Sequence, residues 1–204
     1  MHETMPLQRA PALGQGARRG AFGASHSGQS DANLCLKSVT GFHVAQAHAL
    51  RGRSGAIAEA VTGRFALALP GANRCAAASG ITLIGAGPER WLILTAHQLS
   101  EDALGESAIV FTLSGSRALF SIEGPKAAAL LAKGTSIDLH ERHFGAGSAA
   151  LTRIGHFSAV LWRPGDGPRY CALIARSFAE SFWEWLVLAG EEFGGIAGEE
   201  EPFQ

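Results

Sequence analysis

The stretch that decides the fold is ALFSIEGPKAAALLAKG, residues 118–134. Its first five residues, 118–122, are apolar apart from one serine, which predicts a buried strand. Gly124-Pro125 then opens a helix that carries Leu130 and Leu131 and stops at the glycine that ends the stretch. Proline at the start of a helix and glycine just past its end are the placements that backbone geometry favours. The stretch therefore predicts a strand that passes directly into a helix.

Outward from this stretch, the chain shows the same succession of elements twice. The later round continues with the expected strands Ala149–Ile154, Phe157–Trp162 and Tyr170–Ala175 and a last helix from Ser177. The earlier round comprises Thr40–Ala47 as a strand, Ser54–Thr62 as a helix, Gly80–Ile84 and Trp91–Thr95 as strands, and a weak helix at about Ser100–Glu106. Residues 87–96 also resemble residues 167–176, because both run from a Gly-Pro turn through an aromatic residue into an apolar strand. These repeats predict an α+β fold of duplicated β-α-β-β-α units, with a mostly antiparallel sheet and helices packed against it.

Both ends of the chain differ in composition from its middle. Residues 1–33 are rich in Gly, Ala, Ser and Arg without hydrophobic periodicity, which predicts a flexible tail or a start site placed too far upstream. Residues 194–204 carry three consecutive glutamates, which predicts an acidic tail. A single α+β domain is expected between them, over residues 36–193.

Charge and apolar content exclude several classes of function. The chain carries 17 Lys and Arg against 18 Asp and Glu. Its longest basic run is Arg18-Arg19, so it offers no basic stripe for nucleic acid. No apolar run approaches the roughly 20 residues that span a bilayer. Cys35, Cys75 and Cys171 lie far apart and form no CxxC pair, which argues against a disulfide framework and favours a cytoplasmic protein.

The last helix carries the clearest local pattern. Ser177 and Glu180 fit a capping box, in which each side chain accepts a hydrogen bond from a backbone N–H at the start of the helix. The opposite side from its apolar face carries Trp183 and Val187. An exposed tryptophan is an isolated side chain, a contact for a neighbouring loop, or an anchor for another chain, since tryptophan is enriched at interfaces. We therefore name Trp183 and Val187 as candidate partner-interface residues. The side expected against the sheet carries Phe178, Phe182, Trp185, Leu186 and Ala189.

The motifs of common catalytic and cofactor sites are incomplete in this sequence. Residues 85–90, GAGPER, begin like the dinucleotide motif GxGxxG but lack its third glycine, so we interpret them as a hairpin turn. The phosphate-binding motif GxxxxGK[ST] and the hydrolase motif GxSxG are absent from the sequence. Cys171 lies within an apolar strand, which predicts a buried, inert thiol. His43, His48 and His156 are interpreted as structural or surface residues.

The richest polar cluster is DLHERH, residues 138–143. Two histidines three residues apart, His140 and His143, could chelate a metal ion on a helix if Asp138 or Glu141 also turned inward. The alternative is a solvated loop whose Asp and His side chains bond local backbone groups, and this is the interpretation we favour. We therefore expect no catalytic, cofactor-binding or metal-binding residue in this chain.

Several of these segments occur in the order known from one protein family. They are residues 87–92, 122–127, 131–134, 137–140, 152–156 and 176–186. Together they resemble the gamma subunits of heterotetrameric sarcosine oxidases over roughly residues 40–190. The resemblance is weakest before Ala60, and residues 1–33 have no counterpart in it.

The resemblance implies a fold related to the folate-binding domain of the glycine-cleavage T-protein. It also implies a complex with alpha, beta and delta subunits that oxidises sarcosine to glycine, passes the one-carbon unit to tetrahydrofolate and releases hydrogen peroxide. FAD, FMN and NAD would belong to the alpha and beta subunits and zinc to the delta subunit. This chain would then be a non-catalytic structural subunit without a cofactor. The alternatives are a stand-alone folate-binding or aminomethyltransferase-like protein, which Asp138 in the loop after the Gly-Pro helix favours, and a stand-alone regulatory domain.

Overall fold

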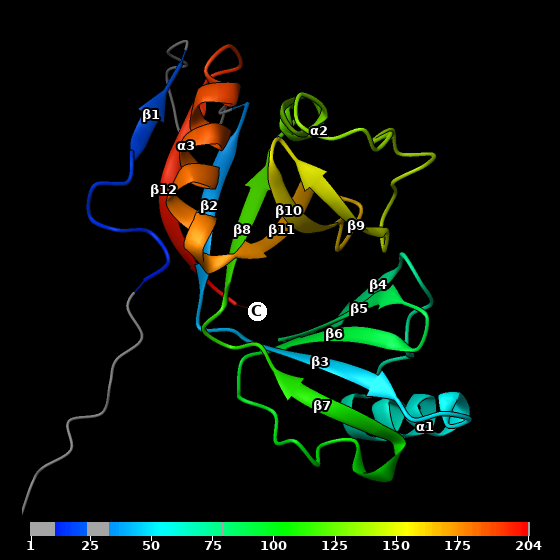
Figure 1. Ribbon diagram of the computed structural model, residues 1–204. Coiled ribbons are helices and arrows are strands. Elements are labelled where there is room, and N and C mark those ends of the chain that lie inside the picture. The colour runs from blue at the N-terminus through cyan, green and yellow to red at the C-terminus, as the bar shows by residue number, and fades with distance from the viewer. Residues whose placement is uncertain (1–10, 24–32, 79, 204) are drawn as a thin grey trace, which may run out of the picture.

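The strands of this chain form two sheets, one above the other in Figure 1. The computed structural model describes residues 11–23, 33–78 and 80–203. Neighbouring strands run antiparallel except β12 and β2, which pair in parallel. The seven-stranded sheet has the order β1 (Gly20–Phe22), β12 (Gly195–Pro202), β2 (Cys35–Thr40), β8 (Arg117–Glu123), β11 (Arg169–Ala175), β10 (Phe157–Trp162), β9 (Ala149–Ile154). The five-stranded sheet has the order β4 (Cys75–Ala78), β5 (Ile81–Gly87), β6 (Arg90–Thr95), β3 (His43–Ala49), β7 (Ala108–Thr112).

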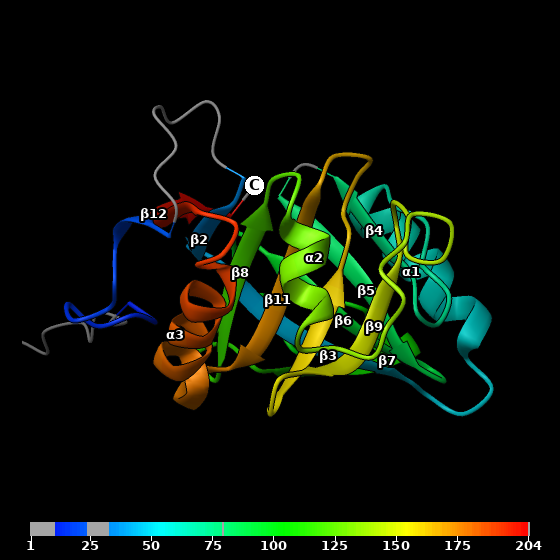
Figure 2. The ribbon, with the colours of Figure 1, turned by 90° about the horizontal axis from the view of Figure 1, so that it is seen from above.

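The α-helices of the described residues lie on the outer faces of the two sheets. Figures 1 and 2 show α2 (Ala127–Ala132) and α3 (Ala179–Gly190) on the seven-stranded sheet, and Figure 1 shows α1 (Ser54–Phe65) on the far side of the five-stranded sheet. The order of layers is therefore helix, sheet, sheet, helix, and the expected α+β class is confirmed. Among the residues that the structure describes, no helix is long and apolar enough to cross a membrane. The short 3-10 turns are η2 (Gly105–Ser107) and η3 (Arg176–Phe178).

Both faces of the seven-stranded sheet are apolar, which explains why its central strands are apolar almost throughout. Side chains alternate between the two faces of a strand. In β8, Phe120 and Ile122 therefore point to the outer face, where they belong to the cluster under α2 and α3. Leu119, one residue before Phe120, points to the other face and packs with Leu94 of the five-stranded sheet. The opening stretch of the sequence thus connects two separate cores.

The five-stranded sheet is also apolar on both faces. In β6, Trp91 and Ile93 belong to the cluster beside α1, whereas Leu92 and Leu94 face the seven-stranded sheet. The expected hairpin at residues 85–90 is confirmed, because β5 and β6 pair across a turn at Pro88 and Glu89. The close approach of the chain to itself here explains one glycine. A Cβ at Gly85 would lie 2.0 Å from the Gly71 carbonyl oxygen.

The prediction of tails at both ends is wrong for the residues that the structure describes. Residues 194–204 contain β12, which pairs with β2 on one side and β1 on the other. Residues 11–23 contribute Leu13 and Phe22 to the buried cluster around α3. A three-residue strand and a glutamate-rich strand carry too little apolar periodicity to be recognised in the sequence. Residues 1–10, 24–32 and 204 of the expected tails lie outside the described residues.

The prediction that Trp183 and Val187 lie on an outer face is also wrong, because both are buried, with exposures of 0% and 1%. The buried stripe of α3 is Ala179, Phe182, Trp183, Leu186, Val187 and Gly190. These positions are three and one apart in alternation, as expected for a narrow helical stripe. The indole N–H of Trp183 donates to the backbone oxygen of Arg18 at 2.8 Å. The segment that was expected to be a tail therefore covers the residues that were expected to bind a partner.

The expected capping box at the start of α3 does not form. The helix begins at Ala179 after the 3-10 turn η3, and no side chain caps it. The Glu180 carboxylate instead accepts a hydrogen bond from the backbone N–H of Gly14 at 3.0 Å. The Glu180 carboxylate, which the sequence pattern assigns to the helix cap, therefore binds the N-terminal segment instead.

Candidate functional site

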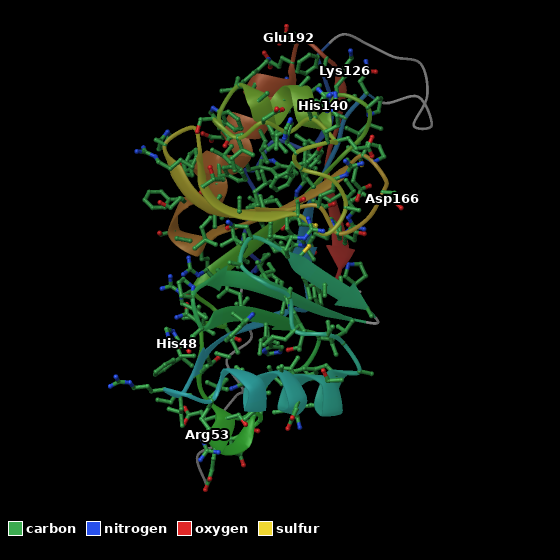
Figure 3. All side chains as sticks on the ribbon, turned by 90° about the vertical axis from the view of Figure 1, so that its right-hand side faces the viewer. His48, Arg53, Lys126, His140, Asp166 and Glu192 are labelled. Atoms are coloured by element: carbon green, nitrogen blue, oxygen red, sulfur yellow. The ribbon has the colours of Figure 1, made fainter. Side chains whose placement is uncertain are left out.

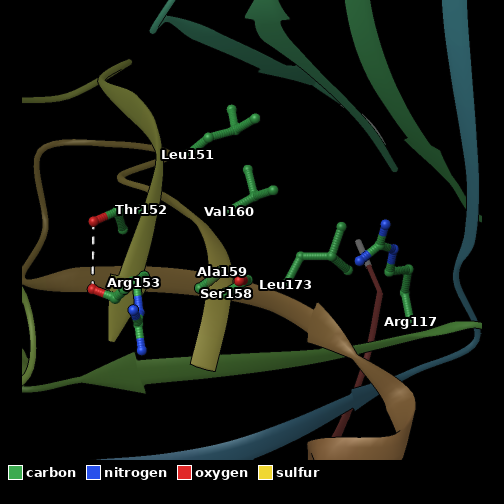
Figure 4. Close-up of a pocket in the computed structure, with 8 residues that line it drawn as sticks. All are labelled: Arg117, Leu151, Thr152, Arg153, Ser158, Ala159, Val160 and Leu173. Atoms are coloured by element: carbon green, nitrogen blue, oxygen red, sulfur yellow. Dashed lines mark hydrogen bonds between the residues drawn. The ribbon is translucent and has the colours of Figure 1, made fainter. Parts of the chain in front are cut away.

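The candidate site is an open pocket of about 450 Å³ on the inner face of the seven-stranded sheet. In Figure 4, Leu151, Val160 and Leu173 project from neighbouring strands to the same side, and Arg117 stands at the end of the row. Viewed from above, the strands of the two sheets cross (Figure 2). The full lining is Arg117, Leu151, Thr152, Arg153, Ser158, Ala159, Val160 and Leu173.

Strand register explains how these side chains meet. Leu151 pairs with Val160, and Val160 pairs with Leu173. Because Leu173 packs in the cluster between the sheets, the whole row faces the five-stranded sheet. Two residues further along β9, and thus on the same face, is Arg153. The corresponding step along β8, from Leu119, reaches Arg117.

The charged side chains that line this pocket are all positive. Its lining contains the guanidinium groups of Arg117 and Arg153 and no carboxylate. The Nε of Arg117 is buried without a hydrogen-bond partner in the described part of the chain. A buried donor without a partner is costly, and the geometry therefore favours an incoming acceptor.

The five-stranded sheet presents apolar side chains toward the same space. Phe111 pairs with Gln46 and Ile109 pairs with His48. These positions share the face of Val44, which packs between the sheets. Phe111 and Ile109 are nevertheless 51% and 48% exposed. We define the inter-sheet opening as Arg117, Leu151, Arg153 and Val160 of the seven-stranded sheet together with Ile109 and Phe111 of the five-stranded sheet.

The opposite end of the space between the sheets contains two thiols, and one of them, Cys171, lines a smaller pocket of about 90 Å³. Burial raises the pKa of Cys171 from 9.0 to about 12 and that of Cys75 from 9.0 to about 11. Both groups are therefore protonated at neutral pH. The expectation that Cys171 is buried is confirmed, since its exposure is 7%. Because the thiolate is the nucleophile, these protonated thiols are suited to packing against their neighbours and not to nucleophilic chemistry.

An ion-pair network joins four strands beside these thiols. The Glu123 carboxylate contacts Lys37 at 3.4 Å and Arg169 at 3.2 Å. Arg169 also contacts Glu201 of β12 at 3.1 Å. Burial alone lowers the pKa of Lys37, but attraction to Glu123 and other negative groups outweighs burial and raises it. The glutamates of the C-terminal segment therefore include a structural partner of β11.

The loop of residues 138–143 makes the local bonds that its sequence favours. The Asp138 carboxylate accepts from the backbone N–H of His140 at 2.9 Å, which confirms that interpretation of the loop. Glu141 contacts the buried Arg163 at 3.2 Å. In the residues that the structure describes, no group of three or more His, Cys, Asp or Glu is arranged to hold a metal ion. In Figure 3 His140 lies with the helix-covered side of the seven-stranded sheet and His48 with the five-stranded sheet.

The residues of the inter-sheet opening were not singled out by sequence analysis. Leu151 and Arg153 alternate with outward residues in a strand that was correctly predicted, so the strand itself was recognisable. Which strand face stays uncovered depends on how the two sheets cross, and residues 149–154 alone do not encode that. Exposed fractions, available only from the structure, identify the opening.

Comparisons with known proteins agree on one family. A model of the sarcosine oxidase gamma subunit family matches residues 51–192. The sarcosine oxidase subunit gamma of Corynebacterium sp. (strain U-96) is 34% identical over 121 residues, which are 56% of this chain and 58% of that protein. The chain thus spans less than two thirds of the length of the curated relatives that it matches.

Solved structures agree with this assignment. A chain of the heterotetrameric sarcosine oxidase from Corynebacterium sp. U-96, solved in complex with pyrrole 2-carboxylate, matches with a TM-score of 0.69 and 29% identity. The match covers 78% of this chain and 85% of that chain. Glycine cleavage system aminomethyltransferase T from Bartonella henselae matches with a TM-score of 0.57 and 14% identity over 83% of this chain and 48% of that chain. The second match confirms the expected T-protein-like fold. This chain belongs to the sarcosine oxidase gamma subunit family.

Proposed function

We propose that this chain is a structural subunit of a heterotetrameric sarcosine oxidase. The observation that carries the proposal is the family match over residues 51–192. The similarity to a chain of a solved heterotetrameric enzyme supports it. The complex would oxidise sarcosine to glycine, pass the one-carbon unit to tetrahydrofolate and release hydrogen peroxide. Its other members would be the alpha, beta and delta subunits, in the cytoplasm.

The proposed role of this chain is non-catalytic. FAD, FMN and NAD would lie in the alpha and beta subunits and zinc in the delta subunit. The pocket supports this division for folate as well. The amino group and ring N–H of a pterin donate hydrogen bonds that a carboxylate would accept, and the pocket lining has two guanidinium groups and no carboxylate to receive the pterin.

We also infer that the two halves of the domain are duplicated β-α-β-β-α units. The strand order β4-β5-β6-β3 in one sheet corresponds to β9-β10-β11-β8 in the other. In both halves a helix follows the fourth strand of that order, α1 after β3 and α2 after β8. This correspondence supports the shared succession that the sequence suggests at residues 87–96 and 167–176.

Co-expression with the other oxidase subunits of the same genome tests the proposed function. The affinity tag is placed on this chain, and the mass of the purified assembly and its sarcosine-dependent peroxide production are measured. We expect all four subunits in equal amounts, together with activity. Recovery of this chain alone, with normal sarcosine oxidation by the remaining subunits, would overturn the proposal.

Calorimetric titration of the isolated chain with tetrahydrofolate tests the alternative. We expect no saturable heat. Saturable micromolar binding would favour a folate-dependent protein of the aminomethyltransferase type instead.

A further inference from the structure

We propose that the inter-sheet opening receives an acidic, apolar segment of another subunit of the complex. The inference rests on the proposed function, because it takes the partner to be a member of the same assembly. It adds to that function a specific surface, the chemistry of the segment that the surface fits, and the residues that recognise it.

The two inward-turned sheet faces carry several large exposed apolar side chains. Leu151 is 51% exposed on the inner face of the seven-stranded sheet, and Ile109 and Phe111 are exposed on the face of the five-stranded sheet that is turned toward it. Half of the large exposed apolar side chains in the described residues thus lie on the two sheet faces that are turned toward each other. Contiguous exposed apolar surface marks interaction sites, whereas scattered single residues need no explanation. The other three, Leu50, Phe178 and Leu188, lie outside the opening.

The charged side chains of the opening determine the charge of the partner segment. Lys37 and Arg169 of the same sheet both contact the Glu123 carboxylate. No ion pair or side-chain hydrogen bond of the Arg117 or Arg153 guanidinium occurs among the described residues, and the lining offers them no acid. Arginine binds carboxylates through paired, charge-assisted hydrogen bonds. The complementary ligand therefore carries Asp or Glu.

The arrangement of these groups describes the shape of the segment. The apolar row Leu151–Val160–Leu173 runs across three strands, and the two arginines lie one step further along the same face. A matching segment inserts an apolar side chain against the row and directs a neighbouring carboxylate to Arg117 or Arg153. The pocket, at about 450 Å³, is large enough for several side chains of a folded partner.

The first experiment measures affinity for the purified assembly of the remaining subunits. Leu151→Asp and Arg153→Glu, made in the full chain, are expected to weaken binding at least about tenfold, as truncation of interface anchors commonly does. Leu188→Asp is the matched control for the first variant, because Leu188 is 62% exposed on α3. Arg51→Glu is the control for the second, since Arg51 is also exposed. Raised ionic strength should weaken wild-type binding more than that of Arg153→Glu.

The second experiment identifies the occupant without relying on a disruptive substitution. A photo-crosslinking amino acid replaces Leu151 in one sample and Leu188 in another, and the crosslinked peptides of the assembled complex are sequenced. We expect position 151, and not position 188, to capture one partner segment in which an apolar residue adjoins Asp or Glu. Reversing that carboxylate to Lys should restore binding of Arg153→Glu.

The outcomes separate this inference from the proposed function. If the wild-type chain joins the assembly and Leu151→Asp and Arg153→Glu bind as tightly as the controls, the opening is not the docking surface, although the subunit role stands. A crosslink to a basic segment overturns the inference in the same way. Protection of position 151 by tetrahydrofolate or sarcosine, with assembly unchanged, identifies a small-molecule pocket and also overturns it. Failure of the wild-type chain to join any assembly refutes the proposed function itself.

Discussion

The two faces of the seven-stranded sheet differ in how completely the chain covers their apolar side chains. On the outer face, Phe120 of the sheet and Phe182 and Trp183 of α3 are fully buried between the sheet, the helix and the N-terminal segment. On the inner face, the sheet is covered at one end by the five-stranded sheet, but Leu151 at the other end stays half exposed. The chain therefore supplies its own cover for one face and leaves part of the other uncovered.

This difference separates residues that stabilise the fold from residues available to a partner. Burial of an apolar side chain contributes to folding in proportion to the area removed from water. Substitutions on the outer face should therefore change the free energy of unfolding, whereas substitutions at the opening should leave it unchanged and alter binding. The following predictions test that separation, beginning with the largest expected effect.

Deletion of residues 195–204 should have the largest effect on the outer part of the sheet. It removes β12, the partner of both β1 and β2, together with the Glu201 carboxylate that contacts Arg169. The newly exposed edge of β2 is open to pairing between molecules. We expect loss of the cooperative thermal transition and aggregation, as measured by calorimetry and light scattering. A truncated chain that melts like the full chain would show that β12 is dispensable.

Trp183→Ala should be strongly destabilising. It removes a fully buried side chain and leaves the Arg18 carbonyl without its donor. Loss of a buried aromatic residue costs about 3–5 kcal/mol, which urea unfolding measures directly. Glu184→Ala, on the exposed side of the same helix, is the control, and equal costs at the two positions would contradict the buried placement of Trp183.

Raising the pH should destabilise the end of the inner face that contains Cys171. Burial raises the pKa of Cys171 to about 12 in the folded chain from an ordinary 9.0, so the unfolded chain releases this proton first. The free energy of unfolding should therefore fall as pH rises from about 9 toward 12. Cys171→Ala should flatten this slope between pH 8.5 and 10.5 in urea titrations, and Cys75 and Lys37 account for part of the slope that remains. An unchanged slope in this variant would refute the assignment to Cys171.

Leu151→Asp should have the smallest effect on stability. Because Leu151 is half exposed, we expect a change in unfolding free energy within about 0.5 kcal/mol, equal to that of Leu188→Asp. Thermal unfolding of both variants beside the wild type provides the measurement. A large loss of stability at position 151 alone would mean that the opening belongs to the folded core.

Local sequence patterns predicted the central elements but not their surroundings. Residues 118–134 contain an apolar strand and favourable helix ends, and β8 and α2 follow from them, although α2 begins two residues after Pro125. β4 was missed because its sequence CAAA has no strand preference, and it forms by pairing with β5. β7 was missed as well, although its sequence AIVFT is rich in residues that favour strands.

The candidate surface could not be predicted because burial in this fold is decided by distant segments. Trp183 is covered by residues about 165 positions earlier in the chain, as the Arg18 hydrogen bond shows. Its position in α3 was recognisable from sequence, but its cover was not. Leu151 is the opposite case. It is an apolar residue in a strand whose sequence suggests a buried position, yet it remains half exposed.

The measurement that tests the central claim most directly is sarcosine oxidation by the remaining subunits expressed with and without this chain. The account predicts that omission abolishes soluble, active complex and that the wild-type chain and Leu188→Asp restore it, whereas Leu151→Asp does not. Full sarcosine oxidation in the absence of this chain would contradict the claim that it is a structural subunit of the oxidase.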